Sequence, residues 1–222
     1  WNNPSSVLVG DFIYSRAFQI LVEISDMRIM EIIANTTNKI AEGEVLQLIE
    51  KSNPKSSEES YMRVITNKTA ILFQAAAQCG AILAKSDSKT EKALRSFGMQ
   101  LGIAFQLVDD VLDYSGNADD LGKNIGDDLA EGKSTLPLIY ALRNGSHSQR
   151  DVIAKSLKVE SLSKDMLENV IEIVQNCGGI DYTRRLAETR AERAAKHLNS
   201  LPASKYRKSL ESMVEFSINR NT

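Results

Sequence analysis

The sequence contains no proline between Pro54 and Pro137, a span of 82 residues. Proline interrupts helix interiors because it lacks a backbone N–H and clashes with the preceding turn. Within this span apolar residues recur three and four positions apart, which is typical of amphipathic or buried helices. The whole chain of 222 residues has only 12 Gly and 4 Pro, too few for the many tight turns of an all-β fold. The pattern therefore predicts a protein of long helices.

Charge and cysteine content exclude several classes of protein. Lys plus Arg (27) nearly balances Asp plus Glu (29), so the net charge is -2 and no broad basic surface for nucleic acid or an anionic membrane is expected. Cys79 and Cys177 have no second Cys or His at metal-ligand spacing, which favours buried thiols in a reducing compartment. The most apolar stretch, residues 70–84, is shorter than the roughly 20 residues of a membrane span. With no signal peptide in evidence, we expect a cytoplasmic protein.

Apolar spacing and capping residues place the helices along the chain. The helix expected over 90–114 is nearly free of charge between Arg95 and Asp109, so it should be central and buried on most sides. The segment 115–133, dense in Gly, Asp and Lys, is expected to be a loop. We predict a single all-α domain over residues 1–222. The other helices expected are one capped by Ser5 or Ser6 and running through Leu21, one that begins after Asp26 and runs towards Glu50, and one from Glu58 to Ala84. The pattern is helical again after Pro137, with loops near 144–146 and 201–202, and the last helix covers Lys205 to Arg220.

Three carboxylates stand at positions i, i+1 and i+4 near the end of the central helix: Asp109, Asp110 and Asp113. Asp109 and Asp113 lie one turn apart, roughly 6 Å along the axis, where like charges repel unless a cation neutralises them. Mg²⁺ suits such a site because it prefers one or two carboxylates together with water and phosphate oxygens. A solvated helix end is the alternative interpretation, but the apolar flanking residues favour a buried metal site.

Two Gly-Lys pairs follow the aspartates, at Gly122-Lys123 and Gly132-Lys133, and Lys68-Thr69 interrupts another apolar helix. Lysines bind phosphate as mobile point charges, and glycines allow a loop to approach a ligand closely. Together with the aspartates, these residues predict a phosphate-binding site.

In this combination and order, the motifs resemble those of the trans-isoprenyl (polyprenyl) diphosphate synthase family, most closely its long-chain branch. The resemblance covers essentially the whole chain, and the sequence as a whole is most similar to those of octaprenyl diphosphate synthases. The matching segments are Phe105–Asp113 as the second aspartate-rich motif, Gly122-Lys123, Gly126-Asp127, Gly132–Pro137, Ser6–Phe12, Glu42-Gly43-Glu44 with Gln47, Lys68–Ala70 and the C-terminal Leu201–Arg220.

The resemblance implies an all-α isoprenoid synthase fold, with long helices around a central cavity. It implies Mg²⁺-assisted ionisation of an allylic diphosphate, such as farnesyl diphosphate, and condensation with successive isopentenyl diphosphates. The product is a long all-trans chain, expected to be octaprenyl. We expect a homodimer, although a heterodimer is the alternative. By position it assigns catalysis to Asp109, Asp110, Asp113 and Lys68. It assigns the metal to Asp109 and Asp113, with Asp110 as a ligand or a partner of the ligands, and substrate binding to Lys68, Thr69, Gln106, Lys123 and Lys133.

The first aspartate-rich motif of the family precedes the segment that resembles residues 1–12, and this sequence does not contain it. A fragment of a longer enzyme is therefore expected rather than a natural short form, with helices at its N-terminal side missing and little activity by itself. Exposed apolar surface should then favour dimerisation. The alternative interpretation is a non-catalytic subunit or scaffold of a heteromeric prenyl synthase.

Overall fold

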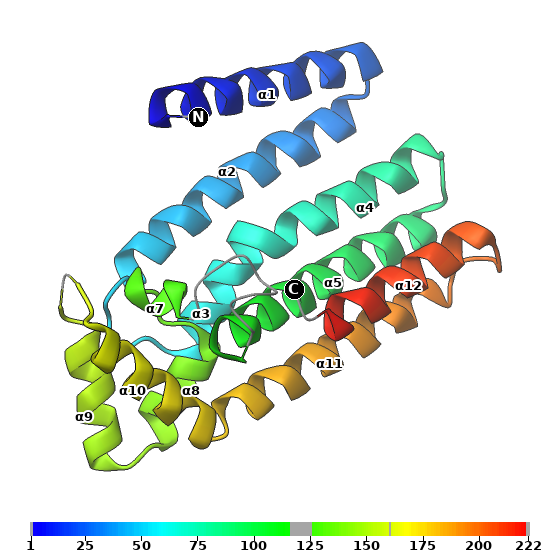
Figure 1. The fold of residues 1–222 in the computed structure, drawn as a ribbon. Coiled ribbons are helices and arrows are strands. Elements are labelled where there is room, and N and C mark those ends of the chain that lie inside the picture. The colour runs from blue at the N-terminus through cyan, green and yellow to red at the C-terminus, as the bar shows by residue number, and fades with distance from the viewer. Residues whose placement is uncertain (1, 116–125, 160, 221–222) are drawn as a thin grey trace.

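The computed structural model describes residues 2–115, 126–159 and 161–220. Within these residues all regular secondary structure is helical, as the sequence predicts (Figure 1). The elements are α1 (Asn3–Ile24), α2 (Met27–Glu50), α3 (Glu58–Ile65), a π-helical turn η1 (Thr66–Ala70), α4 (Ile71–Leu83), α5 (Ser88–Ser115), α7 (Asp127–Ala130), α8 (Leu136–Asn144), α9 (His147–Ser156), α10 (Lys164–Asn176), α11 (Gly179–Leu198) and α12 (Lys205–Asn219).

The expected helices are present, with three local differences. The cap of α1 is Asn2, whose side chain accepts from the backbone N–H of Ser5, so neither Ser5 nor Ser6 is the cap. The predicted loop 115–133 contains the short helix α7, which follows Gly126 in a left-handed conformation with φ of 82°. The predicted helix 58–84 is one rod from α3 through η1 to α4, with the π-helical turn in its middle.

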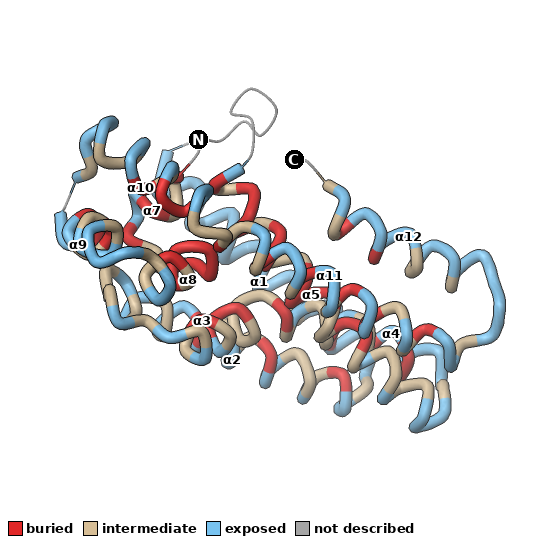
Figure 2. Tube along the Cα trace, turned by 90° about the horizontal axis from the view of Figure 1, so that it is seen from below, coloured by how far each residue is buried: buried red, intermediate tan, exposed pale blue. Residues whose placement is uncertain are grey.

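Helix α5 is the central element of the molecule. It packs between α4 and α11, while α2 lies on α4, α1 on α2, and α12 against both α5 and α11 (Figure 1). The close approach of α4 needs glycine on α5, because a Cβ on Gly102 would lie 2.6 Å from the Cα of Ala70. The predicted burial of α5 is confirmed, with buried residues on most sides of the helix (Figure 2).

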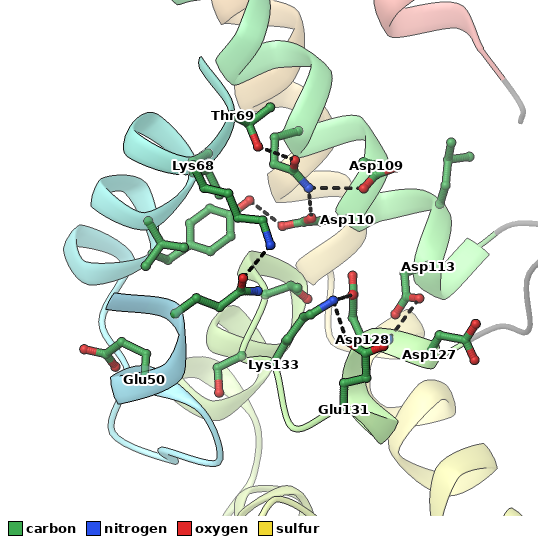
Figure 3. Close-up of a pocket in the computed structure, with 18 of the residues that line it drawn as sticks. Glu50, Lys68, Thr69, Asp109, Asp110, Asp113, Asp127, Asp128, Glu131 and Lys133 are labelled. Atoms are coloured by element: carbon green, nitrogen blue, oxygen red, sulfur yellow. Dashed lines mark hydrogen bonds and ion pairs between the residues drawn. The ribbon is translucent and has the colours of Figure 1, made fainter. Parts of the chain in front are cut away.

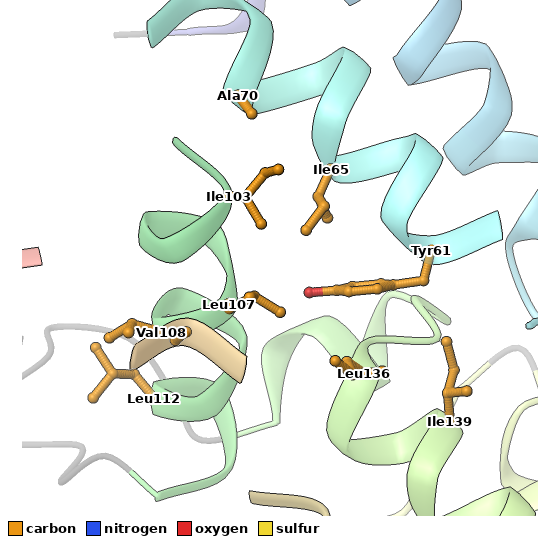
Figure 4. Packing of buried hydrophobic residues seen from close by; sticks show 10 residues of the cluster. Tyr61, Ile65, Ala70, Ile103, Leu107, Val108, Leu112, Leu136 and Ile139 are labelled. Atoms are coloured by element: carbon orange, nitrogen blue, oxygen red, sulfur yellow. The ribbon is translucent and has the colours of Figure 1, made fainter. Parts of the chain in front are cut away.

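A buried cluster joins the C-terminal half of α5 to α3, η1, α8 and α11. In Figure 4 Tyr61 reaches from α3 towards α5, close to Leu107 and Leu136. Leu107 is completely buried, and removing such a side chain leaves a cavity that costs about 2–5 kcal/mol. The carboxylates at the end of α5 are therefore anchored on a rigid part of the core.

Helix α1 differs from the rest because its apolar side chains are mostly exposed. Leu21 is its one buried residue, whereas Leu8 and Phe12 are 67% and 69% exposed. Across the described residues, no helix combines the length and apolar character that a membrane span needs.

Candidate active site

A pocket of about 520 Å³ opens beside the C-terminal half of α5 (Figure 3). Its walls come from α2, α3, η1, α5 and α7, from the segments that link α2 to α3 and α7 to α8, and from the residue that follows α12. The lining residues are Gln47, Glu50, Ser56, Tyr61, Val64, Ile65, Lys68, Thr69, Gln106, Asp109, Asp110, Leu112, Asp113, Asp127, Asp128, Glu131, Lys133, Ser134, Thr135 and Arg220.

Asp110 points into the protein rather than into open space, and it is only 2% exposed. Its Oδ2 accepts a 2.6 Å hydrogen bond from the Tyr61 hydroxyl, and its Oδ1 accepts a 2.8 Å bond from the Gln106 amide. Burial raises the pKa of Asp110 to about 8, although these two hydrogen bonds oppose the shift. Because both of its oxygens already have hydrogen-bond partners, Asp110 is suited to holding Tyr61 and Gln106 in place.

Asp109 and Asp113 are the carboxylates of α5 that can accept a further partner. Asp109 keeps 40% of its side chain exposed and receives a 3.1 Å bond from Gln106. Asp113 has one oxygen bonded to the backbone N–H of Asp128 at 3.3 Å, while its Oδ2 is buried and has no hydrogen-bond partner. Burial raises the pKa of Asp113 to about 7, and repulsion by Asp128 adds to the rise. A buried, unpaired carboxylate oxygen is costly without a cation.

The donor set fits a hard divalent cation that completes its coordination with a ligand. No group of three or more potential ligands that could hold a metal is found among the described residues. Mg²⁺ does not require such a cage, since it keeps several waters and takes phosphate oxygens. The pocket is also strongly acidic, so an anionic ligand needs accompanying cations. It is lined by the carboxylates of Glu50, Asp109, Asp110, Asp113, Asp127, Asp128 and Glu131, against the cations Lys68, Lys133 and Arg220.

Lys68 and Thr69 enter the pocket from η1. The Lys68 ammonium donates to the Gln47 side-chain oxygen at 2.6 Å and lies 3.2 Å from Glu44. The Thr69 hydroxyl donates to the Gln106 side-chain oxygen at 2.9 Å. Because Gln106 donates in turn to Asp109 and Asp110, one hydrogen-bond chain links η1 to the acidic end of α5.

Lys133 lies across the pocket from Lys68, in the segment after α7 (Figure 3). Its ammonium lies 2.7 Å from both Asp128 and Glu131. Burial alone would lower the pKa of Lys133, but the hydrogen bonds to these two carboxylates raise it. The segment is held by the loop after α2, because the backbone N–H of Ser52 donates to the Gly132 carbonyl at 2.8 Å.

Arg220 is a site residue that sequence reasoning missed. Its side chain is 9% exposed and stacks on the Phe105 ring with 3.9 Å between guanidinium carbon and centroid. One nitrogen donates to the Phe105 carbonyl at 2.8 Å and lies 3.8 Å from Asp109. Burial lowers its pKa. The only signal in the sequence was the resemblance of the C-terminal segment, which assigned this arginine no role.

The pocket brings together the sequence-predicted residues that the structure describes, namely Lys68, Thr69, Gln106, Asp109, Asp110, Asp113 and Lys133. Lys123 lies outside the described residues. Sequence reasoning missed Tyr61, Asp128 and Glu131 as well as Arg220. Gln47 and Asp127 were noted only as parts of matching segments.

The sequence of this chain is similar to those of known proteins. The profile of the family described as polyprenyl synthetase matches residues 1–174. The chain is 44% identical over 221 residues to an octaprenyl diphosphate synthase of Escherichia coli, covering 100% of the chain and 68% of the relative. It is 46% identical over 220 residues to an all-trans-nonaprenyl-diphosphate synthase of Rhodobacter capsulatus, covering 99% of the chain and 67% of the relative.

A solved structure, a polyprenyl synthase from Caulobacter crescentus complexed with calcium and isoprenyl diphosphate, superimposes on this chain with a TM-score of 0.95 and 39% identity. The superposition covers 100% of this chain and 68% of that one.

Proposed function

The chain belongs to the polyprenyl synthetase family, and on that premise we propose that its pocket binds an allylic diphosphate and a divalent cation and elongates the prenyl chain. The protein is a prenyltransferase that condenses an allylic diphosphate, such as farnesyl diphosphate, with successive isopentenyl diphosphates. The product is a long all-trans polyprenyl diphosphate. We propose an octaprenyl chain, as in the name of the Escherichia coli relative, and a nonaprenyl chain is the alternative that the Rhodobacter capsulatus relative suggests. The observation that carries the proposal is the convergence of Asp109, Asp113, Lys68 and Lys133 on one pocket.

We propose that the cation is Mg²⁺, held by Asp109 and the unpaired oxygen of Asp113. When bound, it supplies charge neutralisation for the diphosphate as it leaves the allylic carbon. Asp110 positions Asp109 through Gln106 instead of binding the metal, because both oxygens of Asp110 are already hydrogen-bonded.

Lys68 and Lys133 approach the pocket from two sides and bind the diphosphate oxygens. The Thr69 hydroxyl donates to Gln106, whose amide donates to Asp109, and these two side chains orient the leaving group. As the allylic C–O bond breaks, negative charge grows on the diphosphate, and fixed cations at that place stabilise the transition state. The double bond of isopentenyl diphosphate then attacks the allylic carbon, and loss of a proton leaves a chain longer by one isoprene unit.

Apolar side chains also line the pocket, and they suit the hydrocarbon part of the substrate. Val64, Ile65 and Leu112 lie beside the polar residues on α3 and α5. Such walls exclude water from a reactive carbocation, which would otherwise be hydrolysed.

We further propose that two copies of the chain associate through α1. Val7, Leu8, Phe12 and Ile13 are each more than 60% exposed, and contiguous exposed apolar surface of this kind typically marks an interface. Sedimentation should give a dimer mass for the protein and a monomer mass for the double variant Leu8→Ser, Phe12→Ser. A monomer for both proteins would contradict this assembly.

We propose a cytoplasmic location, which the unpaired thiols of Cys79 and Cys177 favour because a reducing compartment keeps such thiols free. Cell fractionation with antibody detection tests this proposal, and recovery in an extracellular or periplasmic fraction would contradict it.

The activity is tested with the protein isolated from its native cells, incubated with Mg²⁺, farnesyl diphosphate and labelled isopentenyl diphosphate. We expect long prenyl products that disappear when EDTA is added, and chromatography of the dephosphorylated products gives their chain length. Absence of elongation by a folded protein with Mg²⁺ present would contradict the proposed function.

A further inference from the structure

The rod formed by α3, η1 and α4 is not uniform where it meets the pocket. Thr66–Ala70 form a π-helical turn, with one residue more than an α-helical turn. π-turns are rare and occur mostly at functional sites. Lys68 and Thr69 both line the pocket, and both belong to the turn.

A glycine on each neighbouring helix makes room for this turn. A Cβ on Gly43 of α2 would lie 2.7 Å from the backbone nitrogen of Lys68, and one on Gly102 of α5 would lie 2.6 Å from the Cα of Ala70. Real Cβ atoms do not approach backbone so closely, so either substitution must push the turn away. Glycine within a helix lowers stability by about 1 kcal/mol relative to alanine, and α2 and α5 both have a glycine where they contact the π-turn.

Each of these glycines precedes a glutamine by four residues, in the segments Gly43-Glu44-Val45-Leu46-Gln47 and Gly102-Ile103-Ala104-Phe105-Gln106. Residues four apart lie on the same face of a helix. Gln47 accepts the hydrogen bond of Lys68, and Gln106 accepts that of Thr69. On both sides of the π-turn, the same Gly-x-x-x-Gln pattern therefore provides space for the backbone and an acceptor for the side chain.

We propose that Gly43 and Gly102 are positioning residues that hold the π-turn at the depth where Lys68 and Thr69 meet the diphosphate. This inference rests on the proposed function and extends it to two residues that line no part of the pocket themselves. Neither glycine has a positive φ, so the requirement at both positions is for space between helices and not for backbone conformation.

The test measures the affinity of the purified protein for inorganic diphosphate with Mg²⁺ by calorimetry. We expect Gly43→Ala and Gly102→Ala to weaken binding about tenfold or more, as the loss of a hydrogen bond to a charged group would. The matched control is Gly80→Ala in α4, because nothing lies within 4 Å of a Cβ at that position, and it should bind within about twofold of the wild type. Wild-type affinity in a folded Gly43→Ala protein would overturn the inference.

A double-mutant cycle separates positioning from general destabilisation. If Gly43 acts through the turn that carries Lys68, Gly43→Ala should cause a smaller loss of affinity in the Lys68→Ala background than in the wild type. Additive losses would overturn the inference while leaving the diphosphate site intact. Failure of the wild type to bind diphosphate would instead contradict the proposed function, and with it the premise of the inference.

Should Gly43→Ala or Gly102→Ala fail to fold, Gln47→Met and Gln106→Met keep the glycines and remove only the acceptors. Each should weaken diphosphate binding a few-fold, and the loss from Gln47→Met should vanish in the Lys68→Ala background. Persistence of that loss without Lys68 would also count against the pairing of α2 with the π-turn.

Discussion

The two sides of the pocket differ in the charge of the groups that contact their ligand-binding side chains. On α5, Asp109, Asp110 and Asp113 receive hydrogen bonds from neutral groups, such as the Tyr61 hydroxyl and the Gln106 amide. The nearest cation on that side is Arg220, 3.8 Å from Asp109. By contrast, both lysines already have carboxylate partners. Lys68 lies 3.2 Å from Glu44, and Lys133 lies 2.7 Å from Asp128 and from Glu131 (Figure 3).

The difference shows which interactions a metal diphosphate can add. The carboxylates of α5 lack a full positive counter-charge, so a bound cation supplies an interaction that the free protein does not have. The lysines have to exchange carboxylate partners for phosphate oxygens, so their net gain is smaller. Substitutions on the α5 side should therefore have the larger effects on catalysis.

Asp109→Ala and Asp113→Ala should have the largest effect. Each removes a proposed metal ligand, and we expect kcat to fall about a thousandfold, as when a principal charge-stabilising group is lost. Elongation of farnesyl diphosphate is the measurement. Asp165→Ala, at an exposed position of α10, is the control that should retain full activity. A loss below about tenfold at both positions would remove the distinction between the two sides.

Lys68→Ala and Lys133→Ala should have an intermediate effect, expressed in KM more than in kcat. We expect KM for the allylic diphosphate to rise about tenfold, because one charge-assisted hydrogen bond to phosphate is lost. Steady-state kinetics at saturating Mg²⁺ measures it, with the exposed Lys164→Ala as control. If kcat fell as far as in Asp109→Ala, the lysines would stabilise the transition state as strongly as the aspartates, which would contradict the proposed difference between the two sides.

The pH dependence of the free energy of unfolding should show that the buried carboxylates of α5 lack a cationic partner in the free protein. The folded-state pKa values of Asp110 and Asp113, about 8 and 7, lie above the ordinary value of 3.8. The folded protein therefore binds more protons than the unfolded chain between these values, and the free energy of unfolding should fall as the pH rises from about 4 to 8.

Thermal melts between pH 5 and pH 8.5 check this dependence. Asp110→Asn cannot ionise at that position, so its melting temperature should fall less with pH than that of the wild type. Mg²⁺ with diphosphate should stabilise the wild type more at pH 8 than at pH 5.5, since metal binding requires deprotonated ligands. Parallel curves for wild type and Asp110→Asn would show that Asp110 ionises normally.

Tyr61→Phe should have the smallest effect. It removes the hydrogen bond to Asp110 while keeping the ring in the core, which should cost about 1–2 kcal/mol of stability. Activity should fall only a few-fold, because the Gln106 contact still orients Asp110. Chemical denaturation and steady-state kinetics test the two parts, and unchanged stability would mean that this contact adds nothing.

The acidic side of the pocket was largely predictable from sequence because its information is local. The central helix and the spacing of Asp109, Asp110 and Asp113 lie within one continuous segment. Sequence could not assign Asp110 to the interior and Asp109 to the pocket, since this depends on Tyr61, which is 49 residues away. Helical spacing put Asp109 and Asp113 on one face of the helix, but it did not indicate which face turns towards the pocket.

The other side depended on contacts between distant segments. The π-turn at Thr66–Ala70 has no signature in its own five residues, because the space for it is set by Gly43 and Gly102. Arg220 stacks on Phe105 from 115 residues away, a return of the chain that helical periodicity does not specify. Lys68 and Lys133 were predicted as phosphate ligands only because the aspartates accompany them in the sequence, and the resemblance to the family then implied that they bind the allylic diphosphate.

A crystal structure of the protein with Mg²⁺ and a non-reactive thio analogue of farnesyl diphosphate tests the central claim most directly. We predict metal density between Asp109 and Asp113, a diphosphate between Lys68 and Lys133, and the prenyl chain along Val64, Ile65 and Leu112. Lys133 should have released Asp128 or Glu131. A diphosphate bound outside this pocket, or bound within it with no metal at Asp109 or Asp113, would contradict the account.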